Sequence, residues 1–114
     1  MRKNADSIWD DIVERELREP GVTAGTGFGR NVGVRIGGKI FAFRSNADLV
    51  VKLPRPRVDE LVDSGAGLRF DPGHGRVMKE WVAVDPRRSR LWSGLVREAR
   101  EYVRPGGSPR SLTS

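Results

Sequence analysis

Two adjacent glycines, Gly37 and Gly38, lie between two short segments that are rich in β-branched and aromatic residues. In residues 32–36 apolar side chains alternate with Gly or Arg, and residues 39–44 resume the pattern of a strand. A glycine pair supplies the positive φ angles that a two-residue hairpin turn requires. The sequence therefore predicts a β-hairpin over residues 32–44, and with it an antiparallel sheet.

The rest of the predicted sheet follows from similar signals. Residues 40–43 are apolar on both faces, which favours a central strand covered by a helix on at least one side. A turn at 45–48 leads to a strand that Pro54 ends, which completes a meander of three strands. Residues 67–70 and 78–85 predict a second hairpin, in which two sets of side chains occupy opposite faces of the later strand: Met78, Val82 and Val84 on one, Lys79, Trp81 and Ala83 on the other. The glycine-rich segment 21–29 leaves a short, irregular strand at 22–26 open.

Three helices are expected. Ser7 is the predicted N-cap of the first helix, which runs at helical spacing to Leu17 and presents an acidic, solvated outer face. Pro56 begins a short second helix that Gly65 ends. Pro86 begins the third, whose apolar stripe comprises Leu91, Trp92, Leu95, Val96, Ala99, Tyr102 and Val103.

These elements predict an α+β fold of two layers, with a five-stranded antiparallel sheet and three helices in the order α-β-β-β-α-β-β-α. A chain of 114 residues is long enough for one domain with a core of its own. We expect that domain over residues 1–105, and a disordered C-terminal tail over residues 106–114.

Composition argues against several classes of function. The chain has no cysteine, no secretory signal and no apolar run that could cross a membrane, so a cytoplasmic protein without a membrane partner is expected. The single histidine, His74, lies between glycines in a turn and has no partners for nucleophilic catalysis. Residues 25–29 precede a strand rather than a helix, which argues against a phosphate-binding loop. We predict a protein that is not an enzyme and has no cofactor or metal.

The net charge of +6 is compatible with an anionic partner, which is nucleic acid, anionic lipid or an acidic protein, although solubility alone explains it equally well. Basic residues form three groups. Helical spacing places Arg90, Arg97 and Arg104 on an exposed stripe with Arg100 beside them, bordered by Glu98 and Glu101. The other groups are Arg69, His74, Arg76 and Lys79 at the second hairpin, and Lys52, Arg55 and Arg57 at the end of the meander.

Several short motifs occur in a recognisable order: GKIFA at 38–42, DLVVKLP at 48–54, MKEWV at 78–82, and a closing helix with Trp92, Leu95 and Tyr102. Over residues 32–103 the chain thus resembles the TfoX N-terminal domain and the MmcQ/YjbR group of small bacterial proteins. The resemblance implies a five-stranded α+β fold like that of secretion chaperones, a DNA-binding or regulatory role, and no catalytic residues.

Three functions remain open at this stage. The first is a regulator that contacts nucleic-acid phosphates through Arg69, Arg76 and Lys79, together with Arg55, Arg57, Arg90 and Arg97. The second is a protein-interaction module, or a homodimer resembling the secretion chaperones. The third is a small-ligand binder in which residues 21–29 form a lid or a cleft wall.

Overall fold

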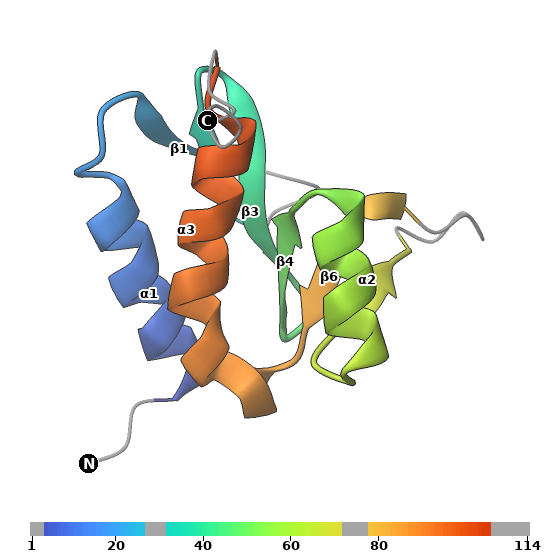
Figure 1. Ribbon diagram of the computed structural model, residues 1–114. Coiled ribbons are helices and arrows are strands. Elements are labelled where there is room, and N and C mark those ends of the chain that lie inside the picture. Colours follow the sequence, from blue (N-terminus) through green and yellow to red (C-terminus); the bar gives the residue numbers. More distant parts are fainter. Residues whose placement is uncertain (1–3, 27–31, 72–77, 106–114) are drawn as a thin grey trace.

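The computed structural model describes residues 4–26, 32–71 and 78–105. Within these residues the fold is α+β, with one antiparallel sheet in the order β1-β2-β3-β4-β6-β5. The strands are β1 (Val22–Thr26), β2 (Val32–Ile36), β3 (Lys39–Ser45), β4 (Asp48–Lys52), β5 (Leu68–Phe70) and β6 (Met78–Val84). The helices are α1 (Ala5–Glu16), α2 (Arg55–Asp63) and α3 (Trp92–Val103), the last preceded by a 3₁₀ segment, η1 (Pro86–Leu91). All three α-helices cover the same face of the sheet (Figure 1).

The predicted hairpin is confirmed. Ile36 pairs with Lys39 across the turn, and the φ angles of Gly37 and Gly38 are +58° and +83°. An added Cβ at Gly37 would lie 2.3 Å from Cγ of Pro105, so the segment that follows α3 packs against this turn. β3 lies between β2 and β4, in the interior of the sheet as expected.

A β-bulge in β3 explains why its sequence is apolar on both faces. Val34 of β2 pairs with Ala42, but the next residue of β2, Arg35, pairs with Ile40, so Phe41 has no partner of its own. Phe41 and Ala42 therefore both contribute to the core beneath the helices, while Phe43 lies on the opposite face.

The prediction of five strands is wrong by one, because β1 is a regular strand that pairs with β2 along its whole length. Its sequence, VTAGT, gives a weak signal because only Val22 has a large apolar side chain. An edge strand is held by backbone hydrogen bonds to a single neighbour and needs few buried side chains. The open alternative of a short strand at residues 22–26 is the correct one.

The pairing of β5 with β6 is confirmed, but the predicted faces of β6 are wrong at Met78. Arg69 pairs with Val82 and Phe70 with Met78, so the register shifts between these two positions. The additional residues of β6 within this irregularity turn Met78 to the other face, where it packs with Trp81 instead of with Val82. The predicted turn with His74 and Arg76 lies outside the described residues.

Two helix starts also differ from the prediction. The N-cap of α1 is Asn4, whose Oδ1 accepts a hydrogen bond from the backbone N of Ser7 at 2.8 Å; Ser7 itself is already helical. Pro86 begins η1 and not α3, because the chain leaves helical geometry at Arg88 (φ −112°, ψ 28°). The start of α2 near Pro56 and its end before Gly65, whose φ is +83°, agree with the prediction.

The main hydrophobic core lies between the helices and the sheet, and includes Phe41, Leu49 and Trp92. A smaller buried cluster on the opposite face consists of Phe43, Val50 and Trp81. Trp92 donates from Nε1 to the carbonyl oxygen of Val84 at 3.2 Å, which joins α3 to the end of β6. No helix in the described part of the chain has the length and apolar character to span a membrane.

Candidate functional site

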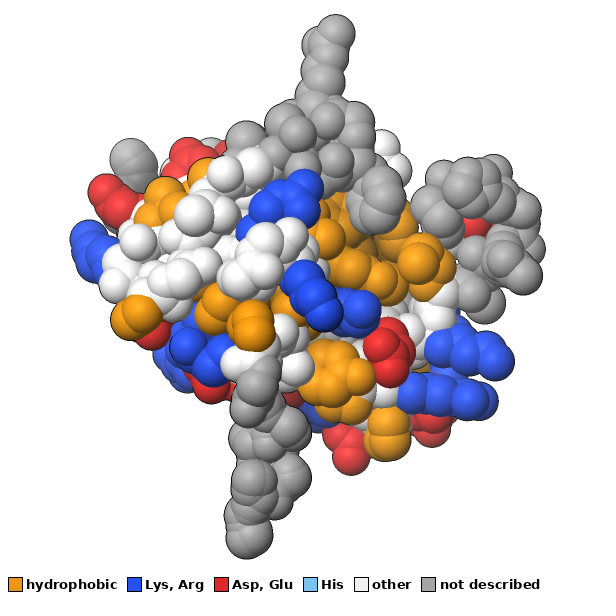
Figure 2. Space-filling view, turned by 90° about the horizontal axis from the view of Figure 1, so that it is seen from above, with side chains coloured by type: hydrophobic (Ala, Val, Ile, Leu, Met, Phe, Trp, Pro, Cys, Tyr) orange, Lys and Arg blue, Asp and Glu red, His pale blue; other side chains and the backbone are white. Residues whose placement is uncertain are grey.

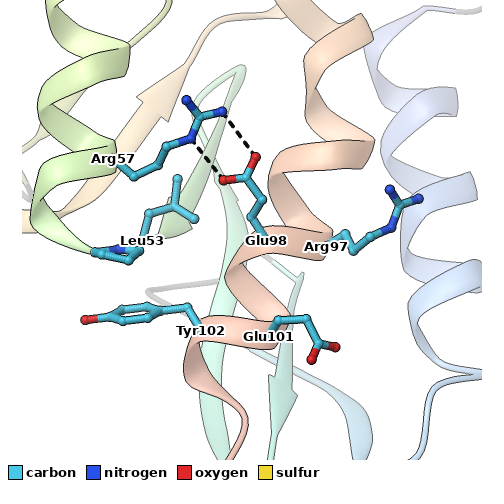
Figure 3. Close-up of a pocket in the computed structure, with 7 residues that line it drawn as sticks. Leu53, Arg57, Arg97, Glu98, Glu101 and Tyr102 are labelled. Carbon is cyan, nitrogen blue, oxygen red and sulfur yellow. Dashed lines mark hydrogen bonds and ion pairs between the residues drawn. The ribbon is translucent and has the colours of Figure 1, made fainter. Parts of the chain in front are cut away.

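The surface between α2 and α3 contains two hollows, of about 500 and 400 Å³. Both are lined by Arg57 of α2 and Glu98 of α3, so they are neighbours along one groove, which we call the interhelical groove. The two helices lie side by side on the sheet (Figure 1). Figure 3 shows Arg57 and Glu98 pointing toward each other across the space between these helices.

The floor of the interhelical groove is apolar. Leu53 lines the first hollow and Leu61 and Leu95 line the second, and all three are buried. At the rim, Tyr102 and Leu91 are 37% and 36% exposed. Seen from the end of the molecule at which α3 ends, hydrophobic side chains lie among basic and acidic ones (Figure 2). An apolar concave surface with a few convergent polar groups is the usual composition of a binding site.

A bidentate ion pair crosses the groove between its two hollows. Arg57 donates from Nε to Oε1 of Glu98 at 3.0 Å and from Nη2 to Oε2 at 3.1 Å (Figure 3). Nη1 of Arg57 donates to Glu60, one turn further along α2, at 2.9 Å. The hydrogen bonds from Glu98, and then those from Glu60, raise the pKa of Arg57. Because Arg57 and Glu98 are 38% and 43% exposed, the pair contributes no more than about 1 kcal/mol to stability.

Gly94 lies in the first turn of α3 and lines the second hollow. Apart from its chain neighbours and the backbone of its own helix, a Cβ atom at this position would meet no atom within 4 Å. Glycine inside a helix costs about 0.8–1.0 kcal/mol relative to alanine, and no steric contact here requires it. The glycine keeps this part of the groove wide.

Tyr102 forms the other end of the groove. Its hydroxyl group donates to Oε2 of Glu80 in β6 at 3.0 Å, and Nζ of Lys52 lies 4.0 Å from Oε1 of the same carboxylate. Burial, and then the hydrogen bond to Glu80, raise the pKa of Tyr102. These contacts hold the phenol ring beside Leu53 (Figure 3).

The predicted basic groups are assembled differently from what their spacing suggested. Arg69 forms an ion pair with Asp59 of α2, and Lys52 and Arg57 also face carboxylates. Arg55 and Lys79 are exposed and have no ion-pair partner in the described part of the chain. The predicted residues that the structure brings together line the groove: Arg57 and Arg97 at the first hollow, Arg57 and Arg90 at the second.

Arg90 and Arg97 are exposed, as predicted, and neither has an ion-pair partner among the residues described. Arg90 lies in η1 and not in α3. The side chain of Arg97 extends away from Arg57 (Figure 3). Arg76 and His74 lie outside the described residues, so their predicted role at the hairpin stays a prediction.

Arg100, predicted to be exposed beside the basic stripe, is only 8% exposed. Its Nη1 donates to Oε1 and Oε2 of Glu16 at 2.9 and 2.8 Å, and Glu16 is fully buried. The acidic face of α1 is therefore not wholly solvated, because the last turn of α1 packs against α3. Spacing along one helix cannot show that a second helix covers part of its polar face.

The residues that give the groove its shape were not identified from the sequence. Leu91 and Tyr102 belong to the predicted apolar stripe of the third helix, and that interpretation treated them as core. Gly94 was the one available signal, because an isolated glycine in a helical pattern often has a packing or functional reason.

No group of three or more metal-ligating side chains occurs in the described ranges. Comparison of the chain with models of known protein families, with characterised proteins and with solved structures finds no match.

Proposed function

We propose that this protein is a non-enzymatic protein-interaction module, and that the interhelical groove accepts apolar side chains from a segment of a partner protein. The observation that carries this proposal is a pair of hollows between two helices with buried leucines in their lining and an ion pair, Arg57 with Glu98, between them. The resemblance to the TfoX and MmcQ/YjbR proteins supports a role without catalysis, since it implies no catalytic residues.

Energetics support a peptide as the ligand. Burial of one leucine-sized side chain contributes about 1.5–3 kcal/mol, so side chains in both hollows would give a useful affinity. A segment that places apolar residues on one side and polar residues on the other fits a groove of this composition. Apolar surface of this kind adds nothing to the binding of a phosphate backbone, which is electrostatic.

A second candidate function is contact with nucleic-acid phosphates. It is favoured by Arg55 and Lys79, which are exposed and have no carboxylate partner in the described ranges. It is weakened at Arg69, Arg57 and Lys52, because each of these faces a carboxylate that would repel a phosphate. We therefore rank it below the protein-interaction module.

The proposal is tested by selecting binders from a displayed library of random peptides. Gly94→Trp places a large side chain in the second hollow, and its Cβ atom has room there. The control, Thr23→Trp, adds the same side chain at an exposed position of β1, at the opposite edge of the sheet from β5. Selected peptides should bind the wild-type protein and Thr23→Trp, and should bind Gly94→Trp at least tenfold more weakly. Circular dichroism shows whether both variants are folded.

Three outcomes would contradict the proposal. Peptides that bind the wild type and Gly94→Trp equally do not use the groove. If no peptide is selected, and duplex DNA binds in a salt-sensitive manner that Arg55→Ala with Lys79→Ala abolishes, the second candidate function replaces the first. A light-scattering mass of twice the chain, lost in Gly94→Trp, would identify the groove's occupant as a second copy of this chain.

A further inference from the structure

We infer that the partner segment carries a carboxylate between its apolar side chains, and that this carboxylate displaces Glu98 from Arg57. Glu98 thereby acts as an internal competitor for the Nε and Nη2 groups of Arg57 until an acidic partner binds. This inference rests on the proposed function and adds the chemistry of the partner to it.

The first step of the argument is the position of the ion pair. Arg57 and Glu98 belong to the lining of both hollows, so a segment whose side chains enter both hollows must pass directly over this pair. A neutral segment would leave the pair in place. A segment with a carboxylate at this point can take over the two hydrogen bonds that Nε and Nη2 of Arg57 now give to Glu98.

The second step is that Arg57 remains in position when Glu98 leaves. Nη1 of Arg57 is bonded to Glu60 on the same helix, at 2.9 Å, and this contact does not involve α3. The Nε and Nη2 edge of the guanidinium therefore stays directed across the groove. An incoming carboxylate meets two N–H donors that are already oriented, so binding loses less side-chain conformational entropy.

The third step is the small cost of releasing Glu98. The carboxylate side chain is 43% exposed and can move into water without leaving a buried charge behind. Exposed ion pairs of this kind shift an equilibrium by only about fivefold or less. The competition for Arg57 is therefore weak enough for an acidic segment to overcome.

The fourth step is the charge around the groove. Arg90 at the second hollow and Arg97 at the first have no ion-pair partner among the described residues. Glu101, the other carboxylate of the first hollow, is held by Arg104 at 2.8 Å and by Arg100 at 3.1 Å. The linings of the two hollows together hold three arginines, Arg57, Arg90 and Arg97, and two glutamates, Glu98 and Glu101, so their net charge is positive and favours an acidic segment.

The experiment uses two displayed peptide libraries with apolar-biased positions on both sides of one central residue, which is Glu in one library and Gln in the other. Peptides from the first library should bind the wild type, and their Gln counterparts should bind about tenfold more weakly, as expected for loss of a charge-assisted hydrogen bond. Arg57→Gln should remove this difference by weakening only the Glu peptides.

Glu98→Gln tests the competitor directly. It should strengthen binding of the Glu peptides about two- to fivefold, the value of an exposed ion pair, and leave the Gln peptides unchanged. Glu14→Gln is the matched control, because Glu14 is exposed on α1 and its substitution removes the same charge away from the groove. The effect of Glu98→Gln must exceed that of the control.

The two proposals fail in different ways. If peptides bind and Gly94→Trp abolishes their binding, but Glu and Gln peptides bind equally or Glu98→Gln behaves like Glu14→Gln, the groove is a binding site and the displacement of Glu98 is wrong. If no peptide of either library binds Gly94→Trp more weakly than it binds the wild type, the proposed function itself is wrong, and this inference is wrong with it.

Discussion

Arg100 of α3 donates through Nη1 to both carboxylate oxygens of Glu16 in α1, at 2.9 and 2.8 Å, and neither side chain is appreciably exposed to water. Two further contacts surround the pair: Arg15 donates to Glu16 at 2.6 Å, and Glu101 accepts from Nε of Arg100 at 3.1 Å. Burying ions has a desolvation cost that their attraction often only balances. The pair therefore fixes how α1 lies against α3 more than it adds to stability.

Removing one partner of this pair should be severe. Arg100→Leu leaves the buried Glu16 carboxylate with Arg15 as its remaining donor, and we expect a loss of about 3 kcal/mol in the free energy of unfolding, the lower end of the range for a broken buried pair, measured by urea denaturation. Arg100→Leu combined with Glu16→Leu should recover much of that loss, because no buried charge remains. Arg97→Leu, an exposed arginine of the same helix, should change stability by less than about 0.5 kcal/mol. Equal effects of the two single variants would contradict a structural role for the pair.

Gly94 should tolerate a side chain that Gly37 cannot. Gly94→Ala enters open space in a helix and should stabilise the protein by about 0.5–1 kcal/mol. Gly37→Ala places a Cβ at a φ of +58° and 2.3 Å from Pro105, so it should destabilise by more than about 1 kcal/mol. The melting temperatures of both variants, compared with that of the wild type, test this prediction. A destabilised Gly94→Ala would mean that the groove is narrower than the structure indicates.

The chain contains one tyrosine, so the absorbance of phenolate reports Tyr102 alone. Because burial and the hydrogen bond to Glu80 raise its pKa, the folded protein should titrate above 10.0, and the chain unfolded in urea should titrate nearer that value. Glu80→Gln should lower the midpoint only in part, since burial is the larger cause. The folded state holds this proton more tightly, so stability should fall as the pH rises through 10. Identical midpoints in folded and unfolded chains would contradict the burial of Tyr102, and an unchanged midpoint in Glu80→Gln would contradict the contact with Glu80.

Asp48 should reduce stability at neutral pH. Burial, and then the charge of Asp85, raise the pKa of Asp48 above 3.8, and the nearby Arg44 offsets this only partly. The folded state therefore binds this proton more tightly than the unfolded state does. Asp48→Asn should stabilise the protein at pH 7, and the gain should shrink as the pH falls through the raised pKa and vanish below about 3.8.

Urea denaturation across this pH range gives the comparison for Asp48. Asp10→Asn serves as the control, because Asp10 is exposed on α1 and its substitution reports the general effect of removing one negative charge. A gain for Asp48→Asn that persists at low pH would show that the effect is not electrostatic.

The sequence predicted those features that depend on neighbouring residues. The turn at Gly37 and Gly38 needs only local conformational freedom, so the hairpin and the order of β2, β3 and β4 were correct. Met78 was assigned to the wrong face because strict alternation cannot reveal an irregularity that pairing with β5 introduces. The strand at Val22 was left open because its small side chains resemble a loop.

The candidate site was harder to predict than the fold. Arg57, Arg90 and Arg97 were named, but for contact with phosphates and in separate groups. Their common feature, the groove, exists because α2 and α3 lie beside each other on the sheet, and no local pattern reports the distance between two helices. Glu16 and Arg100 are far apart along the chain, and their burial follows from the same kind of packing.

Strand β6 lies between β4 and β5, although β5 precedes it along the chain. Strands β2, β3 and β4 are joined by short turns and can pair early, whereas Lys52 of β4 meets Trp81 of β6 only after the intervening chain, including α2, has been enclosed in a loop. The helix α3 follows β6 along the chain. The two helices that form the groove, α2 and α3, are therefore both in place only when β6 has paired with β4. A newly synthesised or partly folded chain accordingly lacks the groove, and we expect partner binding to report that the chain has finished folding.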